Sequence, residues 1–188
     1  MIALLKQMID VYWNMLIFKR SPLNTPDSPM MLGIAVALSL IVSGVQLVLS
    51  YSLGKMTIPF WASILLIIAQ IGLAFAYVGF ILWTQNQLTV WRKMMTCWMM
   101  MLFQLDGLAL LFMFFILTLN LFGWMVVLQK GIIVLSLIVG LLLSFWQVTL
   151  SVRLYQIFLQ KTMLFAFAVY LGWFGVNFLF LMTFKTLF

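Results

Sequence analysis

Five stretches of about twenty or more apolar residues follow one another along this chain, separated by short polar segments. A helix needs about 20 apolar residues to cross the ~30 Å hydrocarbon core of a bilayer, where every backbone polar group must be satisfied internally. Only 7% of the 188 residues are charged, against roughly 25% in soluble domains. The chain is therefore predicted to be all-α, a polytopic helix bundle of a membrane.

The predicted spans occupy most of residues 29–188 and leave no room for a soluble domain of ordinary size, about 50 residues or more. The spans are expected at about 29–51, 58–83, 94–119, 131–150 and 162–184. The segments between them are short, which predicts antiparallel neighbours. Arg153, Gln156 and Lys161 lie in the last of these segments, which we expect to be a polar, basic linker.

Residues 1–28 are predicted to form an amphipathic helix followed by a proline-containing turn. The polar residues of the helix recur at helical spacing and form one stripe: Lys6, Gln7, Asp10 and Asn14. We expect this helix to lie in the membrane interface, and the nearly equal alternative is that it packs its apolar side on the bundle as a surface helix. Lys6, Lys19 and Arg20 are expected to anchor this segment to the membrane surface or to a cytoplasmic partner.

The net charge of +7 does not indicate a nucleic-acid partner, because the basic residues do not cluster as they do in nucleic-acid binders. They fall at the ends of apolar runs, where Lys and Arg orient helices. Seven lie on one side of the predicted bundle and three on the other: Lys6, Lys19, Arg20, Arg92, Lys93, Arg153 and Lys161 against Lys55, Lys130 and Lys185. This excess predicts a cytoplasmic N-terminus and a C-terminus outside.

Small residues recur at four-residue spacing in four of the predicted spans. In lipid, where little hydrophobic force acts between helices, close approach of small residues promotes their association. We expect these residues to form seams within the bundle, and a docking face for another membrane protein or a second copy is the alternative. They are Gly33 and Ala37, Gly72 and Ala76, Ser136, Gly140 and Ser144, and Ala168 and Gly172.

Asp106 is the position that most suggests a functional site. It falls near the middle of the third predicted span, where a carboxyl group is costly and marks a functional site by default. Gln70 and Asn177 are its candidate partners at similar depth. The predicted spans hold no second acid and no His for a proton relay, so a structural hydrogen-bonding role is favoured, with transport or gating as the alternative.

Catalysis is not predicted, because the chain has no His and no Glu. A hydrolytic triad requires a His-like base, and two-carboxylate chemistry requires paired acids. The run MMTCWMMM at 94–101, with Cys97, contains thioether ligands of the kind that select Cu(I). Flexible filling of a core is the favoured interpretation of this run, so neither a metal nor a cofactor is expected.

The order of these parts resembles the Yip1-like family of five-span membrane proteins. The closest local likeness is the tail at 144–180, SFWQVTLSVRLYQIFLQKTMLFAFAVYLGWFGVNFLF. The resemblance implies membrane organisation without catalysis: trafficking adaptors in eukaryotes, inner-membrane proteins in bacteria. The chain lacks the long acidic N-terminal region of the eukaryotic members, which favours the bacterial type.

The sequence therefore predicts a non-enzymatic integral membrane protein of the bacterial inner membrane. Its expected role is that of a scaffold, assembly factor or accessory subunit of a larger membrane complex, with the lipid bilayer and other membrane proteins as partners. The alternative is a small transporter or channel subunit that uses Asp106.

Overall fold

The computed structural model describes residues 2–19, 21–52, 58–121 and 125–187. These residues form helices and contain no strand, which confirms the predicted all-α fold. Five of the helices, α2 to α6, are long and apolar enough to cross a membrane, as in an integral membrane protein. The elements in chain order are α1 (Ile2–Leu16), η1 (Pro22–Asn24), α2 (Pro29–Ser52), α3 (Phe60–Thr84), η2 (Leu88–Val90), α4 (Trp91–Leu121), α5 (Met125–Leu159) and α6 (Met163–Leu187).

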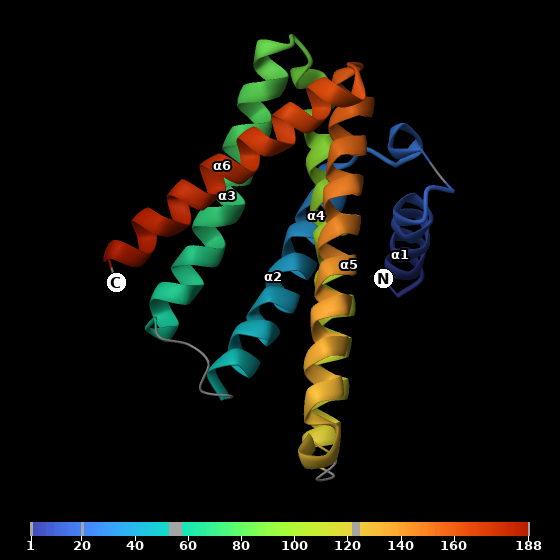
Figure 1. Cartoon of the computed structure of the whole chain (residues 1–188). Coiled ribbons are helices and arrows are strands. Elements are labelled where there is room, and N and C mark those ends of the chain that lie inside the picture. Colours follow the sequence, from blue (N-terminus) through green and yellow to red (C-terminus); the bar gives the residue numbers. More distant parts are fainter. Residues whose placement is uncertain (1, 20, 53–57, 122–124, 188) are drawn as a thin grey trace.

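Helix α4 lies at the centre of the bundle and contacts α1, α2, α3 and α5 (Figure 1). It runs in the same direction as α2, because two side chains of α2 bond to its backbone in the same register. Ser39 Oγ donates to the carbonyl of Met99 at 2.9 Å, and Gln46 Nε2 donates to that of Asp106 at 2.9 Å. Helices α3 and α6 lie on one side of this pair, and α1 lies on the other (Figure 1).

Among the residues whose burial the structure describes, the first half of α4 forms the most completely buried segment. Every side chain from Met94 to Met101 is buried, so this part of the helix is surrounded on all its faces. Unbranched Met side chains adapt to irregular gaps between helices, which suits a helix with neighbours on every side. The burial supports core filling as the role of this run.

The predicted boundary between the fourth span and its linker is wrong. Helix α5 continues to Leu159, and a tight turn follows, in which Gln160 adopts a left-handed conformation with φ of 52°. In the segment that we expected to be a linker, the buried side chains recur at helical spacing and form one helix face. They are Ser151, Val152, Leu154, Tyr155, Phe158 and Leu159. Arg153 and Gln156 lie between these positions, on the outer face of the same helix, and Arg153 stacks on the Phe18 ring at 4.5 Å.

The other four predicted spans agree with the observed helices to within about three residues at each end. The connections before α4 and before α5 are shorter than predicted because these helices begin at Trp91 and Met125. The turn from α3 into η2 contains Asn86 in the left-handed region, with φ of 56°. Asn tolerates this conformation better than most residues, which allows the chain to reverse in a few positions.

Helix α1 packs its apolar side on the bundle, which agrees with the surface-helix alternative for this segment. Tyr12, Met15 and Leu16 are buried, and Gln104 Nε2 donates to the carbonyl of Ile9 at 3.2 Å. Trp146 Nε1 of α5 donates to the carbonyl of Leu16 at 3.3 Å. Two spans therefore hold the backbone of α1 by side-chain hydrogen bonds, and its contact with a membrane surface stays a prediction.

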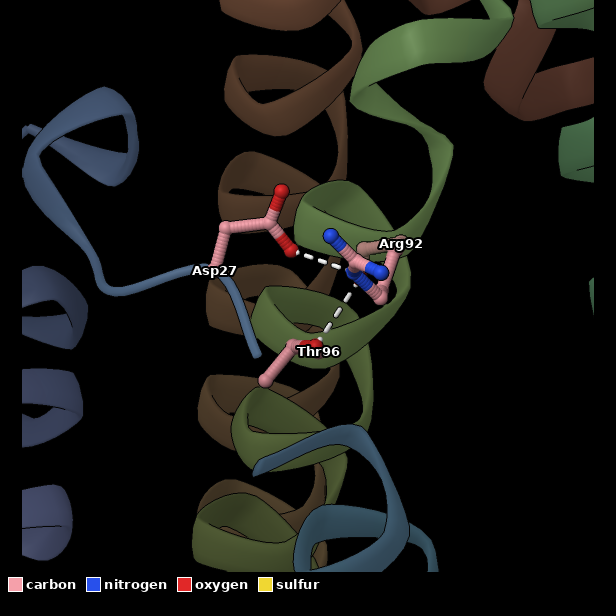
Figure 2. Close-up of polar contacts among 3 residues, drawn as sticks. All are labelled: Asp27, Arg92 and Thr96. Carbon is pink, nitrogen blue, oxygen red and sulfur yellow. Dashed lines mark hydrogen bonds and ion pairs between the residues drawn. The ribbon is translucent and has the colours of Figure 1, made fainter. Parts of the chain in front are cut away.

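The turn between α1 and α2 is attached to the start of α4. Arg92 Nε donates to Asp27 Oδ1 at 2.6 Å, and Thr96 Oγ1, one turn further along, donates to the Arg92 carbonyl at 2.9 Å (Figure 2). The hydrogen bond from Arg92 holds the pKa of Asp27 below its usual value. Lys93 Nζ donates to the carbonyl of Leu23 in the same turn. Two cations of α4 thus fix the turn from which α2 begins.

Candidate functional site

A polar cavity of about 260 Å³ lies where all five long helices face one another. Each helix contributes residues of one face at helical spacing. Ser39 and Ser43 of α2 are one turn apart, as are Gln147 and Ser151 of α5. The polar lining comprises Ser39, Ser43, Gln70, Asp106, Gln147, Ser151, Tyr170 and Asn177.

Asp106, Gln70 and Asn177, the three intramembrane candidates of the sequence, all line this cavity. Gln70 Nε2 donates to Asn177 Oδ1 at 3.3 Å, which joins α3 to α6. These two amides therefore bond to each other rather than to Asp106. Within the described residues, the Asp106 carboxylate has neither a hydrogen bond nor an ion pair, and the bond from Gln46 goes to its backbone carbonyl.

Asp106 lies at the midpoint of α4, about 22 Å along the axis from either end at 1.5 Å per residue. An ionised carboxylate in such a position is costly unless a counter-charge or several hydrogen bonds compensate it. The cavity lining contains no Lys and no Arg. The site therefore offers one acidic group, neutral oxygen and amide groups around it, and room for several waters.

Aromatic residues form another part of the cavity wall: Trp98 of α4, and Tyr170 and Trp173 of α6. The Trp98 and Trp173 rings meet edge to face, with centroids 5.5 Å apart and planes at 82°. Tyr77 of α3 lies against Trp173 at 5.5 Å, and its hydroxyl donates to the carbonyl of Val169 at 2.6 Å. Contacts from three helices thus fix the two indole rings.

Sequence reasoning did not connect several members of this lining with Asp106: Ser39, Ser43, Gln147, Ser151 and Tyr170. Their signal is a polar or amphipathic residue repeated one turn apart within an otherwise apolar span. That signal is weak, because single Ser residues also occur in spans as packing residues. Two of these positions, Gln147 and Ser151, lie beside the boundary that was misplaced in α5.

Most of the small residues expected in packing seams lie on open faces of their helices. A Cβ atom built on Gly33, Gly72 or Gly140 would meet no atom within 4 Å. Two small residues that are buried, Ala35 and Ala74, lie two positions from Gly33 and Gly72, on the opposite faces of their helices. The other members of the predicted set are exposed or, for Ser136, partly exposed: Ala37, Ala76, Ser136, Ser144 and Ala168.

Gly172 of α6 is the member of the predicted set that does make a close contact. A Cβ atom at this position would lie 2.6 Å from the Tyr77 hydroxyl oxygen, closer than real Cβ atoms approach. The absence of a side chain at Gly172 allows Tyr77 to cross to α6 and reach the Val169 carbonyl. Gly172 therefore forms part of the α3–α6 seam beside the cavity.

The predicted surface anchors are partly described. Lys6 and Lys19 are exposed, as anchoring side chains would be, and Arg20 lies outside the described residues. Of the basic residues used to orient the bundle, Lys55 also lies outside them. Anchoring to a membrane surface stays a prediction.

No family model, no curated protein and no solved structure matches this chain. The Yip1-like resemblance therefore stays a prediction. The arguments that follow rest on the residues and contacts of the cavity.

Proposed function

We propose that this chain is a small, non-enzymatic transporter or channel subunit that holds a monovalent cation at Asp106. The observation that supports it is a carboxylate without a side-chain partner in a cavity lined by all five long helices. Asp106 is partly buried within a span, and a carboxylate in such a surrounding is stabilised when a cation neutralises it. One carboxylate neutralises one positive charge, which favours a monovalent cation.

The position of the cavity supports movement of its ligand. Intramembrane ionisable residues that face a bundle interior mark pathways for ions and substrates. The residues around the cavity belong to helices on both sides of the bundle, α2, α4 and α5 on one side and α3 and α6 on the other (Figure 1). A change in the angle between these groups would change access to Asp106 from either membrane face.

Uptake into liposomes tests the proposal. The purified chain is reconstituted, and entry of radioactive Na⁺, Rb⁺ and choline is measured with and without an imposed membrane potential. We expect potential-driven uptake of at least one cation, lost about tenfold or more in Asp106→Asn. Asp27→Asn, a change of the same chemistry outside the cavity, should leave it unchanged. Uptake of no cation, or equal uptake by Asp106→Asn, would contradict the proposal.

A scaffold, assembly factor or accessory subunit is the second candidate, and the outer part of α5 favours it. Between Gly131 and Phe145 this helix buries only Ile132, and the small residues Ser136, Gly140 and Ser144 lie on its uncovered surface. Helices with such surfaces associate closely with partners in membranes. Gentle extraction of the tagged chain should then recover stoichiometric membrane proteins, and Gly140→Leu should release them. A lone monomer unaffected by Gly140→Leu would contradict this role.

We also propose the bacterial inner membrane as the location, with the N-terminus in the cytoplasm. The asymmetry of Lys and Arg supports this orientation. Reporter fusions to the turn between α3 and α4 and to the C-terminus test it, since they should report opposite sides. Cytoplasmic activity of a C-terminal fusion would reverse the proposed orientation.

A further inference from the structure

A basic groove of about 670 Å³ lies between the end of α1 and the last turns of α5. Leu23 of η1 and Met163, the first residue of α6, complete its wall, so the groove lies where several helices begin or end. Helix ends are the level at which basic side chains of a membrane protein meet lipid headgroups. The polar and basic residues of the lining are Arg153, Gln156, Gln160 and Lys161.

The two cations of this groove have no counter-charge in the described part of the chain. Neither the Arg153 nor the Lys161 side chain forms a hydrogen bond or an ion pair with a described residue. The three acids of the chain are Asp10, Asp27 and Asp106, and none of them lines the groove. The groove is therefore complementary to an anionic group from outside the chain.

The end of α1 positions one of these cations. Phe18 has φ of 61°, and its N–H donates to the Met15 carbonyl at 3.1 Å. The Lys19 N–H donates to the Asn14 carbonyl at 2.8 Å, which completes a helix-ending motif that usually has Gly at the left-handed position. A Phe in this conformation is sterically unfavourable, and here it places its ring 4.5 Å from the Arg153 guanidinium carbon. Arg153 is thus held at the groove before any ligand binds.

An apolar groove of about 500 Å³ continues from the basic groove. The two grooves share Phe18 and Thr149 in their linings. Trp146 also lines the apolar groove, and its bond to the Leu16 carbonyl at 3.3 Å fixes the indole beside the end of α1. The residues of α5 that follow one another along both grooves recur at three- and four-residue spacing, on one face of the helix: Val139, Leu142, Trp146, Thr149, Arg153, Gln156 and Gln160.

The length of the apolar groove matches one leaflet of a bilayer. From Thr149 to Val139 it follows α5 for about 15 Å at 1.5 Å per residue, half of the ~30 Å hydrocarbon core. Basic pockets between membrane helices bind anionic lipid headgroups. A basic groove at the helix ends that opens into an apolar groove of this length has the two parts that a phospholipid requires.

We propose that the basic groove and the apolar groove together bind one anionic phospholipid. Its phosphate lies at Arg153 and Lys161, and an acyl chain follows α5 from Thr149 toward Val139. The lipid attaches the end of α1 to α5, because Phe18 contacts both of its parts. This binding site is separate from the Asp106 cavity, to which α5 contributes Gln147 and Ser151 from its opposite face.

Native mass spectrometry of the full chain, released from detergent micelles, tests the headgroup. The probes are dioleoyl phosphatidylglycerol, which is anionic, and dioleoyl phosphatidylcholine, which has the same acyl chains and no net charge. Each Lys or Arg near an anionic lipid contributes about fivefold in affinity, so we expect the anionic lipid to bind about tenfold or more tightly. Equal binding of the two lipids would overturn the inference.

Charge variants assign the headgroup to the basic groove. Arg153→Gln and Lys161→Gln should each weaken binding of phosphatidylglycerol about fivefold, and Arg153→Lys should weaken it less. Lys185→Gln, which removes an exposed cation of α6 outside both grooves, is the matched control and should leave binding unchanged. Lys161 is exposed, so its variant should keep the melting transition of the original chain even if Arg153→Gln does not. A loss by Lys185→Gln equal to that by Lys161→Gln would overturn the assignment.

Two neighbouring leucines test the acyl chain. Leu142 and Leu141 are both 63% exposed, and of the two Leu142 lines the apolar groove. Leu142→Trp should weaken binding of the dioleoyl lipid about fivefold or more, because the indole occupies volume in which the acyl chain is buried. Leu141→Trp should leave binding unchanged. Equal effects of the two variants would overturn the placement of the chain.

The remaining outcomes concern other occupants. Glycerol phosphate and dihexanoyl phosphatidylglycerol carry the anionic group with no long chain, and either of them binding as tightly as the dioleoyl lipid would show an anion site instead of a lipid site. A dimer of the original chain that Lys161→Gln converts to a monomer would show that a second copy fills the grooves. Asp106→Asn should retain full lipid binding, so failure of cation uptake leaves this inference standing, and absence of lipid binding leaves the proposed function standing.

Discussion

The two halves of α5 differ more than their sequences suggest. From Gly131 to Phe145 the helix is apolar except for Ser136 and Ser144, yet Ile132 alone is buried. From Leu150 to Leu159 it contains Arg153 and Gln156, yet most of its side chains are buried. The half that the sequence marks as a membrane span is the less packed half. Hydropathy measures solubility in lipid, and it does not measure packing against other helices.

The neighbours of each half explain the difference. Near its end α5 contacts α6, which returns from the tight turn at Gln160, as well as α4 and η1. Away from this turn, α6 slants toward α3, so that the early part of α5 lies beside α4 (Figure 1). Because α6 diverges, an apolar helix of 35 residues is covered on many sides at one end and on few at the other.

Two phenylalanines of α5 make the sharpest test of this comparison. Phe158 is 2% exposed and Phe145 is 74% exposed, on the same helix. Phe158→Ala should lower the free energy of unfolding by about 3 kcal/mol or more, because it leaves a cavity in the packed half. Phe145→Ala should lower it by less than about 1 kcal/mol, since lipid or detergent fills the space. Reversible unfolding in mixed micelles measures both.

An equal loss for both variants would break the comparison. It would mean that a second copy or a partner covers the exposed half of α5. Repeating the Phe145→Ala measurement at several protein-to-detergent ratios would identify self-association, because a loss caused by a second copy disappears on dilution.

Two glycines repeat the comparison on a smaller scale. At Gly172 a Cβ atom would lie 2.6 Å from the Tyr77 hydroxyl, and at Gly140 it would meet nothing within 4 Å. Gly172→Ala should cost about 1–3 kcal/mol, because Tyr77 must move and its hydrogen bond to Val169 weakens. Gly140→Ala should be neutral or stabilising by up to about 1 kcal/mol, because Ala favours a helix over Gly.

The Tyr77→Phe background provides the control for this pair. Removal of the hydroxyl relieves the close approach, so Gly172→Ala should cost much less there than in the original chain. A full cost in both backgrounds would show that Gly172 contributes by something other than the Tyr77 contact.

The number and approximate position of the spans could be predicted from apolar length alone, because a bilayer imposes a minimum helix length. The end of α5 could not, because Arg153 and Gln156 resemble linker residues when they are read by polarity. The buried residues beside them, Val152, Leu154 and Tyr155, follow the helical period. A short window of mixed polarity nevertheless does not separate an amphipathic helix end from a loop.

The candidate site was only partly predictable, for a related reason. Asp106, Gln70 and Asn177 stand out because they are polar within apolar runs, and the structure brings them to one cavity. Which helix faces meet depends on tertiary packing, so the Gln70–Asn177 bond and the Trp98–Trp173 contact could not be derived from spacing. The small residues show the same limit, because small-residue spacing does not reveal which face of a span is covered.

Trp146 lies between the exposed and the buried halves of α5, and it tests where the packed half begins. Its Nε1 donates to the carbonyl of Leu16 at 3.3 Å, at the end of α1. Trp146→Phe removes this donor and should cost about 1 kcal/mol. Hydrogen exchange should accelerate across α1 and remain unchanged in α2. Trp83→Phe, at a Trp that is 61% exposed, is the control, and equal acceleration in both would disprove the attachment.

The smallest expected effect comes from Asp27, whose ion pair with Arg92 connects the turn before α2 to α4. Helix α4 in turn packs along α5. Because Arg92 lowers the pKa of Asp27 in the folded chain, the ion pair stabilises the fold above the ordinary pKa, about 3.9, and this contribution disappears as the pH falls through the lowered value. Both side chains are partly exposed, so solvent screens the pair. Asp27→Asn should therefore lower the melting temperature near pH 7 by about 2 °C or less. Near pH 2 the original chain and the variant should melt together, and a difference that persists there would show that Asp27 stabilises the turn by a contact other than its charge.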